Sequence, residues 1–438
     1  MIETKNKECK GHSRCQRIPV SDGLCAFHLP SDHKNSLSCD KYNDLLIEEI
    51  KEAKENRDDI FELHWEGFNF PKDHVLFDFL KFEAVSEKLS KSWINIRESN
   101  IQNILIAARD IHTLILSDSI VHGDTTIGVA DIRRISTGKT IFHGKFHCAS
   151  RTHEFDARGA IFEDEFSFTA TIYKRAIFTN CRFLKSCIFS GVSGQVFENN
   201  ADNEFRIVGF DYSIFGKPNE TLFQDVDLRK ASFNSVALVD VRFNNTNFYQ
   251  EELNRNGLYN EVKELQKNNK PSSNQAKNNN TIKRFHHLIY EYRQIRMAME
   301  SNKEYTKAHD FYIGEMESRQ RQNWSFVIGL YRFSSHFGTN YTRAFCILIC
   351  MFIIHFFLSI ILSPDISILK LCCDSNMANN WLQLSDIAIH SISTGTLQRV
   401  GLLENTSNWQ SLIDLIFRVL IPIQAAMFVL ALRNKTKR

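Results

Sequence analysis

The feature that most constrains this chain is a step of five between large apolar residues. In residues 223–248 every fifth residue is Phe or Leu, and the residue two places earlier is small or β-branched. This step fits neither the 3.6-residue period of a helix nor the two-residue period of a strand. It fits a chain that turns a corner every five residues and stacks turn upon turn, so we predict a solenoid. The predicted core ladder is Phe223, Leu228, Phe233, Leu238, Phe243 and Phe248.

Two further runs keep the same step of five. The first run is Ile96, Ile101, Ile106, Ile111, Leu116 and Val121, and the second is Phe168, Tyr173, Phe178, Phe183 and Ile188. Gly216 to Asn219 then interrupts the pattern, and its Gly-Lys-Pro-Asn composition predicts a loop at one corner. The alternative is ordinary β-structure with accidental spacing, but three separate runs favour the solenoid.

The segment DVDLRKASFNSVALVDVRFNNTNF, residues 225–248, resembles the pentapeptide-repeat proteins. Their unit has Leu or Phe at its centre with Asp or Asn before it, as at Asp227 and Asn247. The resemblance implies a right-handed, four-sided β-helix, which we place at residues 92–250. The resemblance also suggests mimicry of DNA, the function of gyrase-protecting members of that family. That function requires a strongly acidic rod. Residues 92–250 carry 17 Lys and Arg against 18 Asp and Glu, so their charge does not favour that function.

Composition narrows the function further. A chain of 438 residues is long enough for more than one domain. Its net charge of +2 predicts no nucleic-acid binding. Residues 1–14 contain no apolar run, so we expect no cleavable signal peptide. The chain has no glycine-rich phosphate loop, no HExxH and no GxSxG motif, so we predict that it is not an enzyme.

The last quarter of the chain has the composition of a membrane domain. Residues 345–363 and 412–432 are apolar enough to cross a bilayer, and we assign a membrane domain to 323–438. Arginines precede the first span and a basic tail follows the second, so the positive-inside rule predicts a multi-pass inner-membrane protein with both termini in the cytoplasm. The alternative is a pair of buried helices in a soluble domain.

Polar residues within the spans are functional candidates, because ionisable groups are costly in lipid. His355 lies in the first span, and its alternative role is a hydrogen bond between helices. Asp414 and Arg418 lie four apart in the second span and can form an ion pair. Between the spans, residues 382–401 predict an interfacial or re-entrant helix. If this helix is re-entrant, the pore-loop candidates are Ser393, Thr394, Gly395 and Thr396.

The N-terminal 40 residues contain a set of metal-ligating side chains. Cys25 and His28 have the spacing of half a zinc site, and Cys9 and Cys15 can complete it. The layout is similar to Cys/His-rich heads on some pentapeptide-repeat proteins. We therefore expect structural zinc, with free cytosolic thiols as the alternative.

The remaining segments join these parts. Residues 41–91 are expected to form a helical cap, 251–282 a polar linker and 283–322 a pair of cytoplasmic helices. Residues 285–345 and the tail FVLALRNKTKR resemble bacterial pentapeptide-repeat membrane proteins.

Two functions fit these segments. The first is a membrane-anchored scaffold that binds a protein partner at the cytoplasmic face of the membrane. The second is an oligomeric two-span channel or pore gated by the solenoid. The bilayer and further copies of the chain are expected partners in both.

Overall fold

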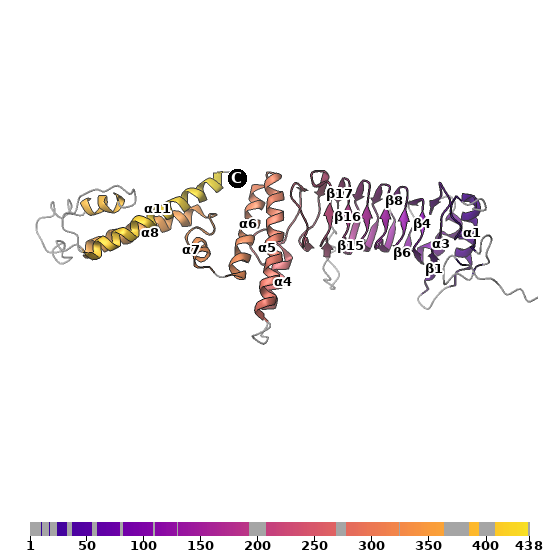
Figure 1. The fold of residues 1–438 in the computed structure, drawn as a ribbon, viewed down its shortest axis with the longest axis horizontal. Helices are drawn as coiled ribbons and strands as arrows, with labels where there is room; N and C mark the ends of the chain where they lie inside the picture. The colour runs from indigo at the N-terminus through magenta and orange to yellow at the C-terminus, as the bar shows by residue number, and fades with distance from the viewer. Residues whose placement is uncertain are drawn as a thin grey trace, which may run out of the picture. The chain divides into compact units, whose positions relative to one another are not determined.

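The computed structural model describes Lys10, Arg17 and residues 24–32, 37–54, 59–78, 82–107, 110–128, 130–191, 207–268, 277–323, 325–362, 385–393 and 408–436. The chain divides into two compact units, Met1–Glu315 and Met316–Arg438. The first unit is a β-solenoid, and the second is built from helices (Figure 1).

The solenoid consists of three parallel sheets, which confirms the predicted fold class. The first sheet contains β1 (Phe61–Glu66), β3 (Ser92–Arg97), β6 (Ile111–Ser117), β9 (Asp131–Ser136), β12 (Arg151–Asp156), β15 (Thr171–Ile177), β18 (Ile207–Gly209) and β21 (Ala231–Ser232). The second contains β4 (Asn100–Ile101), β7 (Ile120–Val121), β10 (Ile141–Phe142), β13 (Ile161–Phe162), β16 (Arg182–Phe183) and β19 (Ile214–Phe215). The third contains β2 (Val75–Leu76), β5 (Asn103–Ile106), β8 (Thr125–Ile127), β11 (Phe146–Cys148), β14 (Phe166–Phe168), β17 (Cys187–Ser190), β20 (Thr221–Gln224) and β22 (Arg242–Asn244).

The register of the first sheet explains the step of five. Ile94 pairs with Leu114 twenty residues later, and Leu114 pairs with Ile135 after twenty-one. One turn therefore holds about four five-residue units. Each turn also carries a residue with positive φ at the corner after the first sheet. These residues are Gly67, Glu98, Asp118, Lys139, Gly159, Asn180, Tyr212 and Ser235.

The core is a set of stacked phenylalanines. Phe142, Phe162 and Phe183 stack with ring centroids 5.1 and 5.2 Å apart, close to the spacing of neighbouring strands of about 4.8 Å. Phe189, Phe223 and Phe243 form a second stack, at 4.8 and 5.1 Å. All six residues of the ladder in 223–248 are buried, with at most 2% of their surface exposed. Stacked rings also contribute attraction beyond their buried area.

Two residues of the predicted second run lie outside the core. Tyr173 is only partly buried and Ile188 is 40% exposed, while Ile172 and Phe189 occupy the core in their place. The step of five is not uniform, because the core residues Phe168 and Ile172 lie four apart and Phe183 and Phe189 lie six apart, and β15 also contains one extra residue relative to β12. A single inserted residue moves the following side chains to the other face of a strand.

Both ends of the solenoid differ from the expected boundaries. The first sheet begins with β1 at Phe61 rather than at residue 92, although α1 (Cys39–Glu52) and α3 (Ser86–Ser90) also lie in the predicted cap. At the other end α4 (Tyr259–Asn268) occupies part of the predicted linker. The helical pair is α5 (Lys277–Ser301) and α6 (Tyr305–Gln322), and Phe311 of α6 packs against Phe248 at 4.9 Å. The helices thus cover the last turn of the core.

The second unit contains α7 (Phe326–Ser335), α8 (Tyr341–Leu362), a short helix at 385–393 and α11 (Asn408–Thr436). The α8 and α11 helices pack antiparallel, since Ala344 accepts a hydrogen bond from Gln424 while His355 lies beside Asp414. Tyr341–Leu362 and Ser411–Asn434 are long and apolar enough to span a membrane.

Candidate functional site

The outer surface of the first sheet collects charged side chains at β9, β12 and β15. Ile135 of β9 and Phe155 of β12 point into the core. On each strand the residue before it, Arg134 or Glu154, points outward. The three strands carry five cations and three carboxylates. They are Arg133, Arg134, Arg151, Lys174 and Arg175, and Asp131, Glu154 and Asp156. This surface is therefore basic, although the solenoid as a whole is close to neutral.

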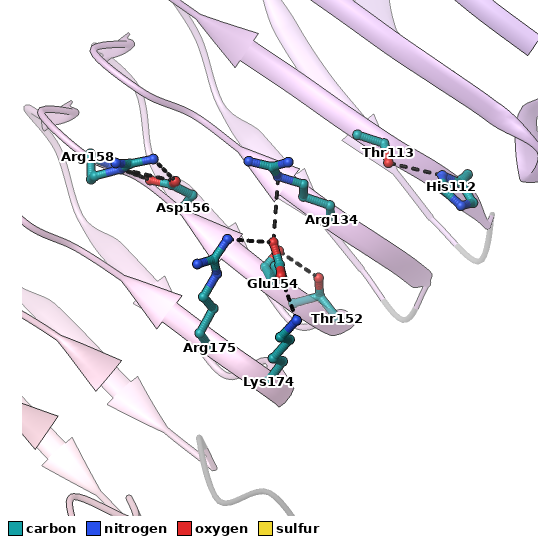
Figure 2. Close-up of polar contacts among 9 residues, drawn as sticks. All are labelled: His112, Thr113, Arg134, Thr152, Glu154, Asp156, Arg158, Lys174 and Arg175. Atoms are coloured by element: carbon teal, nitrogen blue, oxygen red, sulfur yellow. Dashed lines mark hydrogen bonds and ion pairs between the residues drawn. The ribbon is translucent and has the colours of Figure 1, made fainter. Parts of the chain in front are cut away.

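Glu154 is the centre of the charged cluster drawn in Figure 2. Its carboxylate lies 3.0 Å from Arg175 Nη2, 3.6 Å from Lys174 Nζ and 3.8 Å from Arg134 Nε. Burial alone would raise the pKa of Glu154, but the hydrogen bond from Arg175 and the three positive charges lower it overall. Glu154 is thus ionised and holds three cations from the two neighbouring turns, Arg134 on β9 and Lys174 and Arg175 on β15.

A hollow of about 240 Å³ lies on the same surface, beside this cluster. It is lined by Ser90, Ile111, His112, Asp131, Ile132, Arg133, Arg151, His153 and Tyr173. Arg151 pairs with Asp131 at 2.9 Å, whereas Arg133 has no carboxylate partner in the described part of the chain. The hollow therefore presents an arginine whose charge is not neutralised.

His112 completes the polar side of the hollow. Arg133 Nη1 lies 3.5 Å from His112 Nε2, and an arginine can only donate, so that nitrogen accepts. His112 Nδ1 then carries the proton and donates to Thr113 Oγ1 at 3.0 Å (Figure 2). Burial and the nearby charge of Arg133 lower the pKa of His112, which agrees with a neutral imidazole.

The β-bulge between β12 and β15 shapes the aromatic side of the hollow. Thr152 pairs with Ile172 but Glu154 pairs with Arg175, so one extra residue is accommodated in β15. The ring of Tyr173 lies 5.2 Å from that of His153. The irregularity that removed Tyr173 from the core thus places it at the hollow.

A second polar cluster lies inside the helical unit. The two oxygens of Asp414 in α11 contact two different imidazoles, His355 Nε2 of α8 at 2.9 Å and His390 Nε2 of the 385–393 helix at 3.0 Å. All three side chains are buried, with His355 fully enclosed. One carboxylate therefore joins three helices.

The other polar residues expected in this region have different surroundings. Asp414 contacts the histidines rather than Arg418, whose Nε is buried without a hydrogen-bond partner among the described residues. Ser393 is buried and donates to the His390 carbonyl at 2.8 Å. Thr394, Gly395 and Thr396 lie outside the described residues.

The described half of the expected zinc site is Cys25 and His28. Cys25 Sγ and His28 Nδ1 lie 3.1 Å apart, and the second ring nitrogen of His28 is 2.8 Å from the Glu66 carbonyl. Cys9 and Cys15 lie outside the described residues, and no further His, Cys, Asp or Glu of the described ranges completes a metal site with Cys25 and His28.

Comparison of the chain with protein-family models, curated proteins and solved structures gives no match. The two clusters are therefore interpreted from their own residues.

Sequence reasoning missed His390 and the hollow around Arg133. For His390 a signal was present, because Ile387, His390 and Ser391 lie on one buried face of a short helix between two spans. The hollow had no signal in the sequence, because Tyr173 keeps the five-residue step and only the register of the turns places it outside the core.

Proposed function

We propose that this chain is a pentapeptide-repeat scaffold, anchored to the cytoplasmic face of an inner membrane by two spans, and that its solenoid binds a protein partner. The solenoid presents an extended, regular surface, which is how repeat proteins commonly bind. The exposed faces of α8 and α11 include Ile354, Phe357, Leu415 and Val419, a composition that suits lipid rather than water.

The observation that carries the proposal is the uncompensated Arg133 in a hollow lined by Tyr173. Arginine and tyrosine are enriched where proteins bind one another, and a guanidinium recognises a carboxylate through two parallel hydrogen bonds. The neighbouring cations of β9, β12 and β15 extend this positive surface. The partner that fits it is an acidic protein segment.

Binding is tested with the full-length protein in detergent and a fluorescent oligoglutamate peptide. We expect saturable binding that weakens as salt rises, and at least a tenfold loss, about 1.4 kcal/mol, for Arg133→Ala. Arg182→Ala is the matched control, because Arg182 is an exposed strand arginine on the second sheet. Equal losses for both variants would show only general charge attraction and would contradict the site.

A photo-crosslinking residue at position 173 tests the same surface in cells. We expect a defined crosslinked product that disappears with Arg133→Ala. The control position is Ile214, an exposed residue on β19. Crosslinking at position 214 but not at 173 would place the partner elsewhere on the solenoid.

The membrane orientation rests on the apolar helices and the basic residues that flank them. A fluorescent protein fused after Arg438 should fluoresce, because both termini are proposed to be cytoplasmic. Alkaline phosphatase inserted in the segment between the two spans should be active outside the membrane. The reverse pattern would exclude the proposed orientation.

Structural zinc remains a proposal for residues 1–40. The convergence of Cys25 and His28 supports it, as does the contact of the second His28 nitrogen with a backbone carbonyl, a common arrangement around metal-bound histidines. We expect close to one zinc per chain in the purified protein and its loss in Cys25→Ser. Native protein without zinc would rule the site out.

One observation favours a channel as a second candidate. The contacts of His390 and His355 with Asp414 bring a short helix against both spans, as in a two-span pore domain. Ion flux in liposomes that is blocked by Gly395→Trp would support this function. Absence of flux from reconstituted, correctly folded protein would remove it.

A further inference from the structure

We propose that His355, His390 and Asp414 form a proton-binding site that holds the 385–393 helix against the two spans. The site goes beyond the scaffold, because neither partner binding nor anchoring requires it. Its three members come from separate helices of one unit. The argument rests on the direction of the hydrogen bonds, the charge they enclose and one unsatisfied nitrogen.

The hydrogen bonds define where the protons are. An ionised carboxylate only accepts, so both Nε2 atoms that contact Asp414 must carry hydrogen. If both imidazoles are neutral, each Nδ1 carries a lone pair. His355 Nδ1 is buried and has no hydrogen-bond partner among the described residues. This nitrogen is the position at which a further proton can bind.

The charge balance favours occupation of that position. With two neutral histidines the site carries a net charge of −1 in surroundings that include the ring of Phe417, 5.0 Å from His355. An uncompensated buried charge is costly, whereas a hydrogen-bonded pair of opposite charges is much less so. Uptake of one proton forms one N–H bond at Nδ1, breaks none, and brings the net charge of the site to zero.

Among the described residues, few titratable or charged groups face the site on each packed helix. They are His355 on α8, His390 on the short helix and Asp414 on α11, with Arg418 one turn further along α11. No ion pair joins Arg418 to Asp414 in the described structure. Ser359, one turn beyond His355, is also buried, and its hydroxyl has no hydrogen-bond partner in the described part of the chain. The protonated imidazole is thus the closest cation available to the carboxylate.

Protonation then controls how firmly the short helix is held. An imidazolium bound to a carboxylate forms a stronger, charge-assisted hydrogen bond than a neutral imidazole does. Loss of the proton leaves the single carboxylate as an uncompensated charge at the junction of three helices. The 385–393 helix should therefore exchange its amide hydrogens faster when the proton is lost.

The direct test is nitrogen NMR of histidine-labelled full-length protein in detergent, titrated from about pH 5 to pH 9, the range around the ordinary histidine pKa. We expect one imidazolium in this cluster that is still present at neutral pH. His355→Gln keeps a donor for Asp414 but removes the nitrogen to which we assign the proton, so the imidazolium signal of His355 should vanish, and an imidazolium on His390 in its place would contradict this assignment. His287→Gln, at an exposed position of α5, is the control and should leave it unchanged.

Hydrogen exchange of residues 385–393 tests the consequence. Protection should fall at least tenfold when the imidazolium signal disappears at high pH, and His355→Gln should remove this pH dependence. Two neutral imidazoles throughout the titration of the wild-type protein would overturn the proposal, whether or not the variant folds. Nitrogen signals that change on addition of zinc or a chelator would also overturn it, because the cluster would then bind a metal.

Discussion

The two units of this protein use the same apolar residues in opposite ways. In the solenoid, Phe223 and Phe243 stack inside while the charged side chains of the strands face outward. In the helical unit, Ile354 and Phe357 face outward, and His355 and Asp414 are enclosed. This difference fits the proposal that the solenoid meets water and the helical unit meets lipid. Water favours the first arrangement and lipid permits the second, because hydrocarbon tails are as apolar as the side chains themselves.

The largest effect expected from this comparison is a charge in the solenoid core. Phe233 is almost fully buried and stacks on Phe210 at 5.2 Å, so Phe233→Asp should destabilise the solenoid by about 4 kcal/mol or more. Ala237→Asp is the control, because Ala237 is exposed in the same turn. Thermal unfolding followed by circular dichroism measures both variants. Similar melting of the two would contradict the inward ladder.

A matched pair of exposed isoleucines tests whether the two units meet different solvents. Ile354 in α8 is 51% exposed and Ile214 in β19 is 52% exposed. Ile354→Arg should hinder membrane insertion by about 3 kcal/mol, whereas Ile214→Arg should change little. The fraction of protein that resists alkaline extraction from membranes is the measurement. If both variants insert like the wild type, α8 does not face lipid at this position.

A buried carboxylate in the first unit provides a pH-dependent test. Burial raises the pKa of Glu291 to about 8, although Asn260 donates to it. Between the ordinary carboxyl pKa and about pH 8 only the folded state holds the proton, so the free energy of unfolding should fall as pH rises. Below this range both states are protonated, and above it both are ionised, so the dependence should level off.

Glu291→Gln removes this titration. We expect the variant to be more stable than the wild type at pH 8 and to show a flatter pH dependence of the melting temperature. Glu300→Gln, an exposed position on the same helix, is the control. An unchanged slope in Glu291→Gln would assign the pH dependence to another group.

The smallest effect concerns the thiols of the solenoid core. Burial raises the pKa of Cys148 to about 11 and the pKa values of Cys181 and Cys187 to about 12, so little thiolate is available. In the native protein these residues should react with iodoacetamide more slowly than the partly exposed Cys39. Peptide mass spectrometry before and after denaturation measures the difference. Native labelling of Cys181 at the rate of Cys39 would show that the core opens.

The sequence predicts most of the fold because repetition amplifies a weak local signal. Isolated apolar residues do not predict a fold, but a step of five maintained through Phe223, Phe233 and Phe243 is compatible with few folds. The prediction fails where core residues lie four or six apart, at Tyr173 and Ile188, because pattern reading assumes a constant step. It also fails at β1 and α4, where packing against the repeat rather than a local pattern decides the structure.

The candidate sites were harder to predict from the sequence than the fold was. His355 and Asp414 were singled out because charged groups are rare in lipid, but His390 joins them only through tertiary packing. The hollow beside Arg133 depends on side chains from four strands, β6, β9, β12 and β15, separated by about twenty residues each. Only the register of the turns brings them together.

The register between β15 and β18 has a practical consequence. Ala176 pairs with Val208, thirty-two residues later, although the turns from β3 to β15 are separated by twenty or twenty-one residues. The pairing resumes regardless of how much chain lies between, since each turn is held by its neighbours and not by its own length. A turn of this rod can therefore accommodate extra residues, such as a tag or a whole domain, while the turns on either side keep their pairing.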